Sequence, residues 1–364
     1  MTKSSKRFLL DLLSTPSPTG FEVAGQRKWA EYVRGFADAV ENDAYGTAWA
    51  TIESAESKTK KPMPTLMLEA HADEIGYIVK HITKEGFLRI DRVGGSDAAT
   101  GRGRRLTFFG DQGEVTGLIG NTAIHLRKDS LGKENAPQIN ELYVDIGASS
   151  AEEVAERGLR VGHPAVYQDG PEFLGQDRLV GRALDNRVGG FIIAEVTRRL
   201  AAAKKRPSCR TYAVNAVQEE IGGLGAKMVT HRLMPDLCVC LDVTHATDTP
   251  GIDHSKHGEV NLGGGPTIQH GACNHPEVVE RLMTVAEKEG LTLQHESAGR
   301  YSGTDTDQIY HVQQGVPSAL VSLPLRYMHS VVETAHLGDI EQVIQLLTAF
   351  VKSLRPGDQF GVRL

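Results

Sequence analysis

The chain lacks three features that would each indicate a different class of protein: a long apolar run, a cysteine framework and a surplus of positive charge. No run of its 364 residues approaches the ~18 apolar residues of a membrane-spanning helix. Forty basic residues stand against 46 acidic ones, a formal net charge of -6, which argues against a nucleic-acid binder. The four cysteines show no disulfide or zinc-knuckle spacing, and this favours buried thiols in a reduced, cytoplasmic protein.

The first residues, MTKSSKRFLLDLLS, contain basic residues and a few leucines, but Asp11 interrupts the apolar stretch and no small-residue cleavage site follows. We interpret this segment as an amphipathic helix capped by Ser4 or Ser5 and not as a signal peptide. The chain contains no internal repeat and no low-complexity segment. Its length allows one large domain and a second module, at about 150 residues per domain.

Two hydrophobic patterns divide the sequence. Residues 76–176 contain short β-like runs separated by many glycines, which is typical of a small all-β domain. Residues 1–75 and 177–364 alternate strand-like and helical segments, which indicates βαβ units. The predicted fold class is α/β, with a mainly parallel sheet and flanking helices, interrupted by the inserted all-β domain at 76–176.

Several apolar runs end in side chains that bind metal ions. The residues at these ends are His71 and Asp73, Asp185, the pair Glu219 and Glu220, Asp242, and His329. Ligands bind outside the carboxyl ends of the strands in open α/β sheets, where these side chains would converge. Imidazoles and carboxylates together suit zinc, cobalt or manganese. The sequence therefore predicts a metal site at this edge.

Each residue alone has an ordinary structural explanation. Asp185 can cap the following helix, the glutamate pair can begin a solvated helix, and His329 can be a surface histidine. Five such ends together favour the metal site. In extended backbone, Glu219 and Glu220 would point to opposite sides, so that one binds a metal while the other faces a reacting water.

Two further segments bear on the site. The spacing of His71 and Asp73 would put both side chains on one side, where the aspartate can accept the second imidazole N–H. The segment Thr304 to Asp307 is expected to be a helix-start loop that lines the site. The glycines at 263–265 lack the spacing of a nucleotide-binding loop.

Six motifs, in order along the chain, resemble the M42 family of dinuclear metallo-aminopeptidases. They are HADEIG at 71–76, GRALDNRVGG at 181–190, QEEIGGLGA at 218–226, DVTHATDTPG at 242–251, SGTDTDQI at 302–309 and RYMHS at 326–330. The family includes the tetrahedral (TET) glutamyl, leucyl and lysyl aminopeptidases, and some members are labelled endoglucanase. The resemblance covers nearly the whole chain.

The resemblance implies a zinc-peptidase-like fold that binds two divalent metal ions per subunit, zinc or cobalt, with manganese possible. Asp185 would bridge the two ions, His71 and Asp242 would complete one site, and Glu220 and His329 the other. It also implies a β-barrel-like dimerisation domain at 76–176 and a homo-oligomer, built from dimers and able to form a tetrahedral dodecamer.

The remaining roles implied by the resemblance concern Glu219 as general base and Asp73 as the residue that orients His71. One departure stands out, because family members usually have a bulkier or basic pair where this chain has Gly223 and Leu224. The ligands are intact, but the departure raises a question about packing and a subunit contact.

The leading hypothesis is an aminopeptidase that cleaves the first residue from short peptides. Two metal ions would lower the pKa of a bridging water, and Glu219 would take its proton. The alternatives are a related deacylase or carboxypeptidase, a glycosidase, and a non-catalytic assembly protein. Adjacent glutamates are poor partners across a glycosidic bond, and a non-catalytic protein would lack a ligand, whereas none is missing. The sequence leaves open the preferred N-terminal residue, the physiological metal, and dimer against dodecamer.

Overall fold

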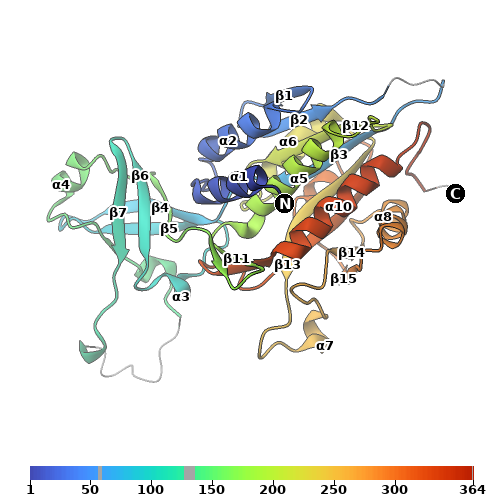
Figure 1. The fold of residues 1–364 in the computed structure, drawn as a ribbon. Helices are drawn as coiled ribbons and strands as arrows, with labels where there is room; N and C mark the ends of the chain where they lie inside the picture. Colours follow the sequence, from blue (N-terminus) through green and yellow to red (C-terminus); the bar gives the residue numbers. More distant parts are fainter. Residues whose placement is uncertain (56–59, 127–135, 363) are drawn as a thin grey trace.

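The structure of the protein is a computed structural model that describes residues 1–55, 60–126, 136–362 and 364. An α/β part is built on an eight-stranded sheet, and a closed barrel lies beside it (Figure 1). In spatial order, the sheet strands are β1 (Ala39–Asn42), β2 (Ala48–Ile52), β12 (Arg210–Ala216), β3 (Thr65–His71), β13 (Leu237–His245), β16 (Ser318–Leu325), β14 (Thr267–Gly271) and β15 (Gln294–Ala298). This arrangement confirms the predicted fold class.

The four central strands of the sheet, β12, β3, β13 and β16, are parallel to one another. The antiparallel pairings lie toward the edges, between β1 and β2, β2 and β12, and β14 and β16. The carboxyl ends of the central strands therefore meet at one edge of the sheet. That edge is where the predicted ligand residues would have to gather.

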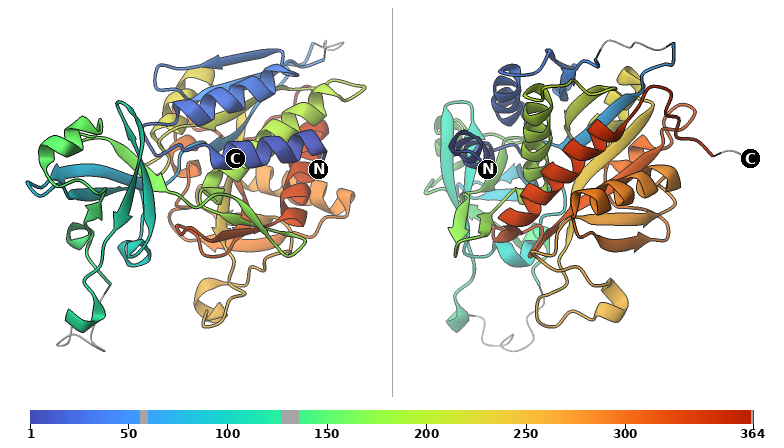
Figure 2. Two further views of the ribbon diagram at one scale, coloured as in Figure 1. Left: turned by 60° about the vertical axis from the view of Figure 1, so that its left-hand side comes forward. Right: turned by 45° about the vertical axis from the view of Figure 1, so that its right-hand side comes forward.

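Helices cover both faces of the sheet. They are α1 (Lys3–Ser14), α2 (Val23–Arg34), α5 (Leu184–Ala201), α8 (Pro276–Glu289) and α10 (Leu337–Ser353) on one face, and α6 (Leu224–Leu233) and α9 (Thr306–Ile309) on the other. Figures 1 and 2 show α2, α5 and α10 side by side over the first face. In β3, Leu66 and Leu68 pack under these helices, whereas Met67 packs on the opposite side. A strand buried on both faces needs a continuous apolar run, which is what the sequence provides.

The barrel is formed within the segment that the sequence assigns to an inserted all-β domain. Its strands are β4 (Gly76–Ile82), β5 (Leu88–Val93), β6 (Arg105–Gly110), β7 (Gly113–Ile119), β8 (Val144–Asp145) and β9 (Pro164–Tyr167), with α3 (Ala98–Gly101) and α4 (Ala151–Glu156) outside. Its interior is a separate apolar core that includes Tyr77, Phe108 and Val144. Closure leaves the barrel without a free sheet edge.

The division of the chain at residues 76 and 176 stays a prediction. After the barrel, β10 (Glu172–Leu174) and β11 (Arg178–Gly181) form a small antiparallel sheet with β17 (Glu333–His336). The chain therefore passes from the barrel to this small sheet between Tyr167 and Glu172, and β11 leads directly into α5.

The predicted N-terminal helix is present, but its cap differs from the prediction. The side chain of Thr2, not of Ser4 or Ser5, accepts the hydrogen bond from the Ser5 N–H. All four cysteines are buried and unpaired, as predicted. Among the described residues, no helix has the length and apolarity to cross a membrane.

Candidate metal centre

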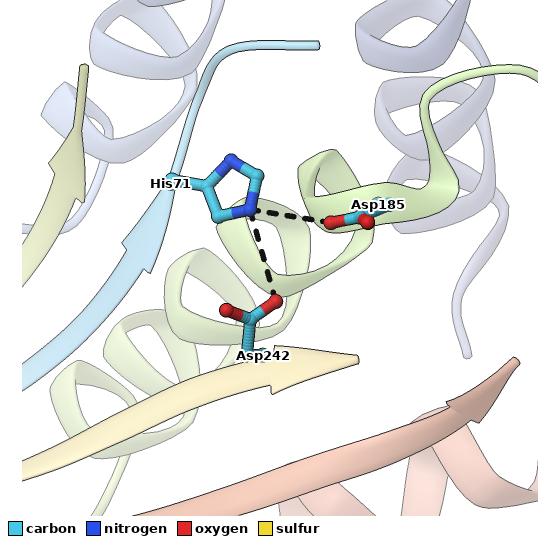
Figure 3. A group of neighbouring side chains, drawn as sticks. All are labelled: His71, Asp185 and Asp242. Carbon is cyan, nitrogen blue, oxygen red and sulfur yellow. Dashed lines mark ion pairs between the residues drawn. The ribbon is translucent and has the colours of Figure 1, made fainter. Parts of the chain in front are cut away.

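The first group of candidate ligands lies at the carboxyl edge of the sheet (Figure 3). His71 is the last residue of β3, Asp242 lies near the end of the neighbouring strand β13, and Asp185 lies at the start of α5. The Nε2 atom of His71 is 3.2 Å from Oδ1 of Asp185 and 3.7 Å from Oδ1 of Asp242. All three residues are buried, and their ligand atoms can hold one metal ion.

A second group shares Asp185 with the first. The Nε2 atom of His329 is 3.2 Å from Oδ2 of Asp185 and 3.7 Å from Oε2 of Glu220. Asp185 thus turns one carboxylate oxygen toward each imidazole. Two ligands bound tetrahedrally at 2.0–2.1 Å from one zinc ion lie about 3.3 Å apart. Both groups have nearly this spacing, so each can hold one ion.

Glu219 belongs to neither group but lies beside both. Its Oε2 atom is 3.9 Å from Nε2 of His71. Together with four candidate ligands it lines a pocket of about 500 Å³ whose wall also includes Thr244, Ser302 and Thr304. Of the predicted segment Thr304 to Asp307, Thr304 lines the pocket, whereas Thr306 and Asp307 belong to α9 (Thr306–Ile309).

The two glutamates lie just beyond the end of β12, but the extended backbone expected for the pair does not continue through Glu220, which lies in a turn. β12 ends at Ala216, and Gln218 has a positive φ of 62°. The backbone N–H groups of both glutamates donate to the two carboxylate oxygens of Asp73, at 3.1 and 3.2 Å. A contact distant in sequence, and not strand alternation, therefore sets the direction of the glutamate side chains.

Asp73 is placed where the sequence predicted and makes more contacts than predicted. Its Oδ1 atom is 3.4 Å from Nδ1 of His71, and its Oδ2 atom accepts a hydrogen bond from the Thr19 hydroxyl. The next residue, Glu74, faces the other way and pairs with the buried Arg182. The Thr15–Gly20 segment thus supports the carboxylate that holds His71 and both glutamates.

Asp185 does not cap α5. Capping of this helix was the structural alternative to metal binding at this residue. Asp185 and Asn186 have non-helical backbone angles. The side chain of Asn186 accepts the Gly189 N–H instead and so caps the regular part of the helix. The carboxylate of Asp185 is consequently free to face the two imidazoles.

Sequence reasoning missed two contributors to the site, Glu333 and the glycine pair after β5. A Cβ atom on Gly94 would lie 3.0 Å from Oε2 of Glu220, and one on Gly95 only 2.4 Å from Nδ1 of His329. The available sequence signal was a glycine pair within the region of short β-like runs. The barrel thus touches two candidate ligands.

The electrostatics of the site require positive charge. Burial and the nearby carboxylates raise the pKa of Glu220 and of Asp242. Burial, opposed by His71 and reinforced by Asp305, Asp242 and Asp185, raises the pKa of Glu219 to about 10. The Oε1 atom of Glu220 is buried without a hydrogen-bond partner among the described residues.

The imidazoles do not supply enough positive charge for these carboxylates. Burial opposes a charge on His71, but its carboxylate neighbours outweigh this and hold the pKa of His71 well above its ordinary value. Even with both imidazoles charged, the carboxylates of the two groups and Glu219 outnumber them. Divalent cations compensate such a cluster and lower the carboxyl pKa values. The residues present therefore fit two cations.

Comparison with known proteins found a matching family and several similar proteins. The family model for M42 glutamyl aminopeptidases matches residues 51–346. The lysyl aminopeptidase of Pyrococcus furiosus is 32% identical over 352 residues, which are 95% of this chain and 96% of that protein. An aminopeptidase from Desulfurococcus kamchatkensis has a similar structure, with a TM-score of 0.88 and 31% identity, covering 97% of this chain and 96% of that one.

A third similar protein is a TET peptidase of Pyrococcus horikoshii, described as able to assemble into a tetrahedron or a large octahedral shell. Its TM-score is 0.83 at 28% identity, and the match covers 96% of this chain and all of the other. The fold and the arrangement of the barrel are therefore shared along nearly the whole chain.

Replacement of Gly95 by alanine tests the contact between the barrel and His329. The new Cβ would overlap the imidazole, which is a rigid ring, so we expect His329 to be displaced from Asp185. Metal binding at the second group should weaken roughly 10- to 100-fold, measured by metal analysis after dialysis against buffered zinc. Gly170→Ala is the control, because nothing lies within 4 Å of its Cβ position; equal metal contents in the two variants would refute the contact's role.

Replacement of Gly223 by alanine tests the departure from the family pattern. Gly223 has a φ of 71°, and its Cβ would lie 2.6 Å from Oδ1 of the buried Asp305. We expect a loss of about 2–4 kcal/mol in unfolding free energy from the backbone conformation and the overlap. Leu224 is 43% exposed, so Leu224→Ala should change stability by less than about 0.5 kcal/mol. Thermal unfolding of both variants makes the comparison, and equal midpoints would contradict the packing role.

Proposed function

This chain belongs to the M42 family of glutamyl aminopeptidases and is a peptidase, and we propose that it uses two divalent metal ions to remove the N-terminal residue from short peptides. The observation that carries this proposal is the pair of ligand groups that share Asp185. They lie beside an unshared glutamate in a pocket of about 500 Å³, large enough for a peptide end.

We assign the ligands by the two groups. His71 and Asp242 would hold one cation, Glu220 and His329 would hold the other, and Asp185 belongs to both groups. Bound zinc, cobalt or manganese supplies Lewis acidity, which polarises a carbonyl group and lowers the pKa of water toward neutrality. Asp73, next to Nδ1 of His71, accepts the second imidazole N–H and fixes the orientation of the ring.

Glu219 acts as the general base in this proposal. Its carboxylate takes a proton from the attacking water and later delivers it to the leaving amine. The raised pKa of Glu219 would keep it protonated at neutral pH. Because positive charge beside a carboxyl group favours its ionised form, cations held by the two groups would lower this pKa, and Glu219 would then be able to accept a proton.

We also propose a cellular compartment and an oligomeric state. Four buried, unpaired thiols suit the reducing cytoplasm. The TET peptidase of Pyrococcus horikoshii, which can assemble into a tetrahedron or a large octahedral shell, supports a homo-oligomer. In our proposal the barrel mediates dimerisation and dimers form a dodecamer. Light scattering at several protein concentrations distinguishes the dimer from the dodecamer.

Substitution of Glu219 by glutamine tests the role of the base. The change removes the proton acceptor but leaves both ligand groups intact, so kcat should fall roughly 10²- to 10⁴-fold while metal content stays unchanged. Glu277→Gln, at an exposed position on α8, is the matched control and should keep full activity. Near-normal kcat in the Glu219 variant would eliminate this residue as the base.

Removal and return of metal tests the reaction class. Chelated protein should lose hydrolysis of aminoacyl-p-nitroanilides and regain it with zinc, cobalt or manganese, because the carbonyl is no longer polarised without a cation. The same panel with N-acetylated substrates should give no activity. Preferential cleavage of the acetylated substrates would indicate a deacylase instead, and the relative rates of the free substrates would identify the preferred N-terminal residue.

A further inference from the structure

Glu333 is a buried carboxylate next to the metal centre that has no part in the proposed ligand set. It is 1% exposed and is the first residue of β17. On the neighbouring strand β11 its partner is Gly181, from which the chain continues through Arg182 and Ala183 to Asp185. β17 is therefore paired with the strand that delivers the bridging carboxylate.

The two oxygens of Glu333 accept backbone N–H groups from two different segments. Oε2 accepts from Leu184 at 2.8 Å and from Asp185 at 3.1 Å. Oε1 accepts from His329 at 2.8 Å. One side chain therefore joins the backbone of Asp185 to the backbone of His329, although the two residues are far apart in the sequence.

Both segments need such an external partner. Ala183 and His329 have φ values of 62° and 59°, in the left-handed region that non-glycine residues rarely adopt. Asp185 has non-helical angles, so its N–H group lies outside the regular hydrogen bonding of α5. Strained backbone persists at functional sites only where the surroundings hold it, and Glu333 provides three of the bonds that do so.

We propose that Glu333 is a positioning residue that fixes the spacing between Asp185 and His329 and thereby determines the affinity of the second cation. This inference rests on the proposed binding of two metal ions. Its counterpart is Asp73, which binds the backbone of Glu219 and Glu220 in the same manner. Each irregular segment that carries a candidate ligand is therefore held by a buried carboxylate.

The two cations depend on Glu333 to different extents. The second group contains two residues whose backbone Glu333 binds, Asp185 and His329. The first group contains only Asp185, and its other members lie on strands β3 and β13, where ladder hydrogen bonds fix them. Loss of Glu333 should therefore weaken the second cation more than the first.

Titration of the metal-free protein with Co²⁺, followed by the visible absorption of the bound ion and by metal analysis, measures both affinities. The variants are Glu333→Gln and Glu333→Ala. Glutamine keeps the volume of the side chain but replaces one acceptor oxygen with an NH₂ donor, which cannot accept from an N–H group. We expect the second Co²⁺ to bind roughly 10- to 100-fold more weakly in both variants, with a smaller change for the first.

Asp339→Asn is the matched control. Asp339 is also buried and accepts two backbone N–H groups, from Gly263 and Gly265, in a loop that carries no candidate ligand. This variant should bind both Co²⁺ ions as the unaltered protein does, even if its thermal unfolding midpoint falls. Unfolding midpoints of all metal-free variants separate loss of metal affinity from loss of fold.

The possible results separate failure of the two-metal proposal from failure of the inference about Glu333. If the unaltered protein binds fewer than two Co²⁺ ions, the proposed two-metal function fails. If it binds two, the inference about Glu333 is overturned by unchanged second-site affinity in the Glu333 variants, by equal weakening of both ions, or by the same loss in the Asp339 variant. Failure of both Glu333 variants to fold, with the Asp339 variant folded, would assign Glu333 to fold stability and also overturn it.

Discussion

The residues around the candidate metal centre are arranged so that they accommodate several buried carboxylates that repel one another. Asp185, Glu219, Glu220 and Asp242 crowd around two imidazoles, and two like charges 4 Å apart repel by about 4 kcal/mol at an effective dielectric constant of 20. A divalent cation between the carboxylates would add attractions that outweigh this repulsion. The carboxylates behind the ligands are compensated differently, because Asp73 and Glu333 accept backbone N–H groups. These hydrogen bonds hold the ligand segments in place, and at Glu333 they oppose, without outweighing, the rise in pKa caused by burial and by Asp185.

The inserted barrel takes part in this arrangement. Gly94 and Gly95 follow β5, and their backbone lies against Glu220 and His329 so closely that a side chain would overlap them. A closed barrel with its own apolar core is a rigid support for such a contact. The second ligand group is therefore enclosed from two sides, by the small sheet through Glu333 and by the barrel through the glycine pair. A contact made by the barrel with another subunit would act directly on this group.

The sequence predicts those parts of the site that follow from regular secondary structure. His71 and Asp242 lie where their apolar runs end, because neighbouring parallel strands bring their carboxyl ends to one edge. Features set by distant contacts were not predictable. The backbone at Glu219 depends on Asp73, 146 residues away, and Glu333 binds Asp185 from 148 residues away. His329 lies four residues beyond the end of β16 and reaches the site through a left-handed backbone conformation. The roles predicted for Glu219 and His329 came from the family resemblance, and Glu333 was not predicted at all.

The difference between regular strands and distant contacts also explains why the preferred substrate is harder to infer than the reaction. In the proposed function, the two ligand groups and Glu219 would act on the scissile carbonyl and the attacking water, which are the same for every N-terminal residue. The family model is described as glutamyl, and a relative as lysyl, so family membership does not determine the preference. In this chain the remaining pocket wall is formed by residues such as Thr244, Ser302 and Thr304. The loop that holds Ser302 and Thr304 leads to Asp305, against which Gly223 packs. The departure at Gly223 therefore lies next to this loop of the pocket wall, and the Gly223 N–H also donates to the backbone carbonyl of Glu219.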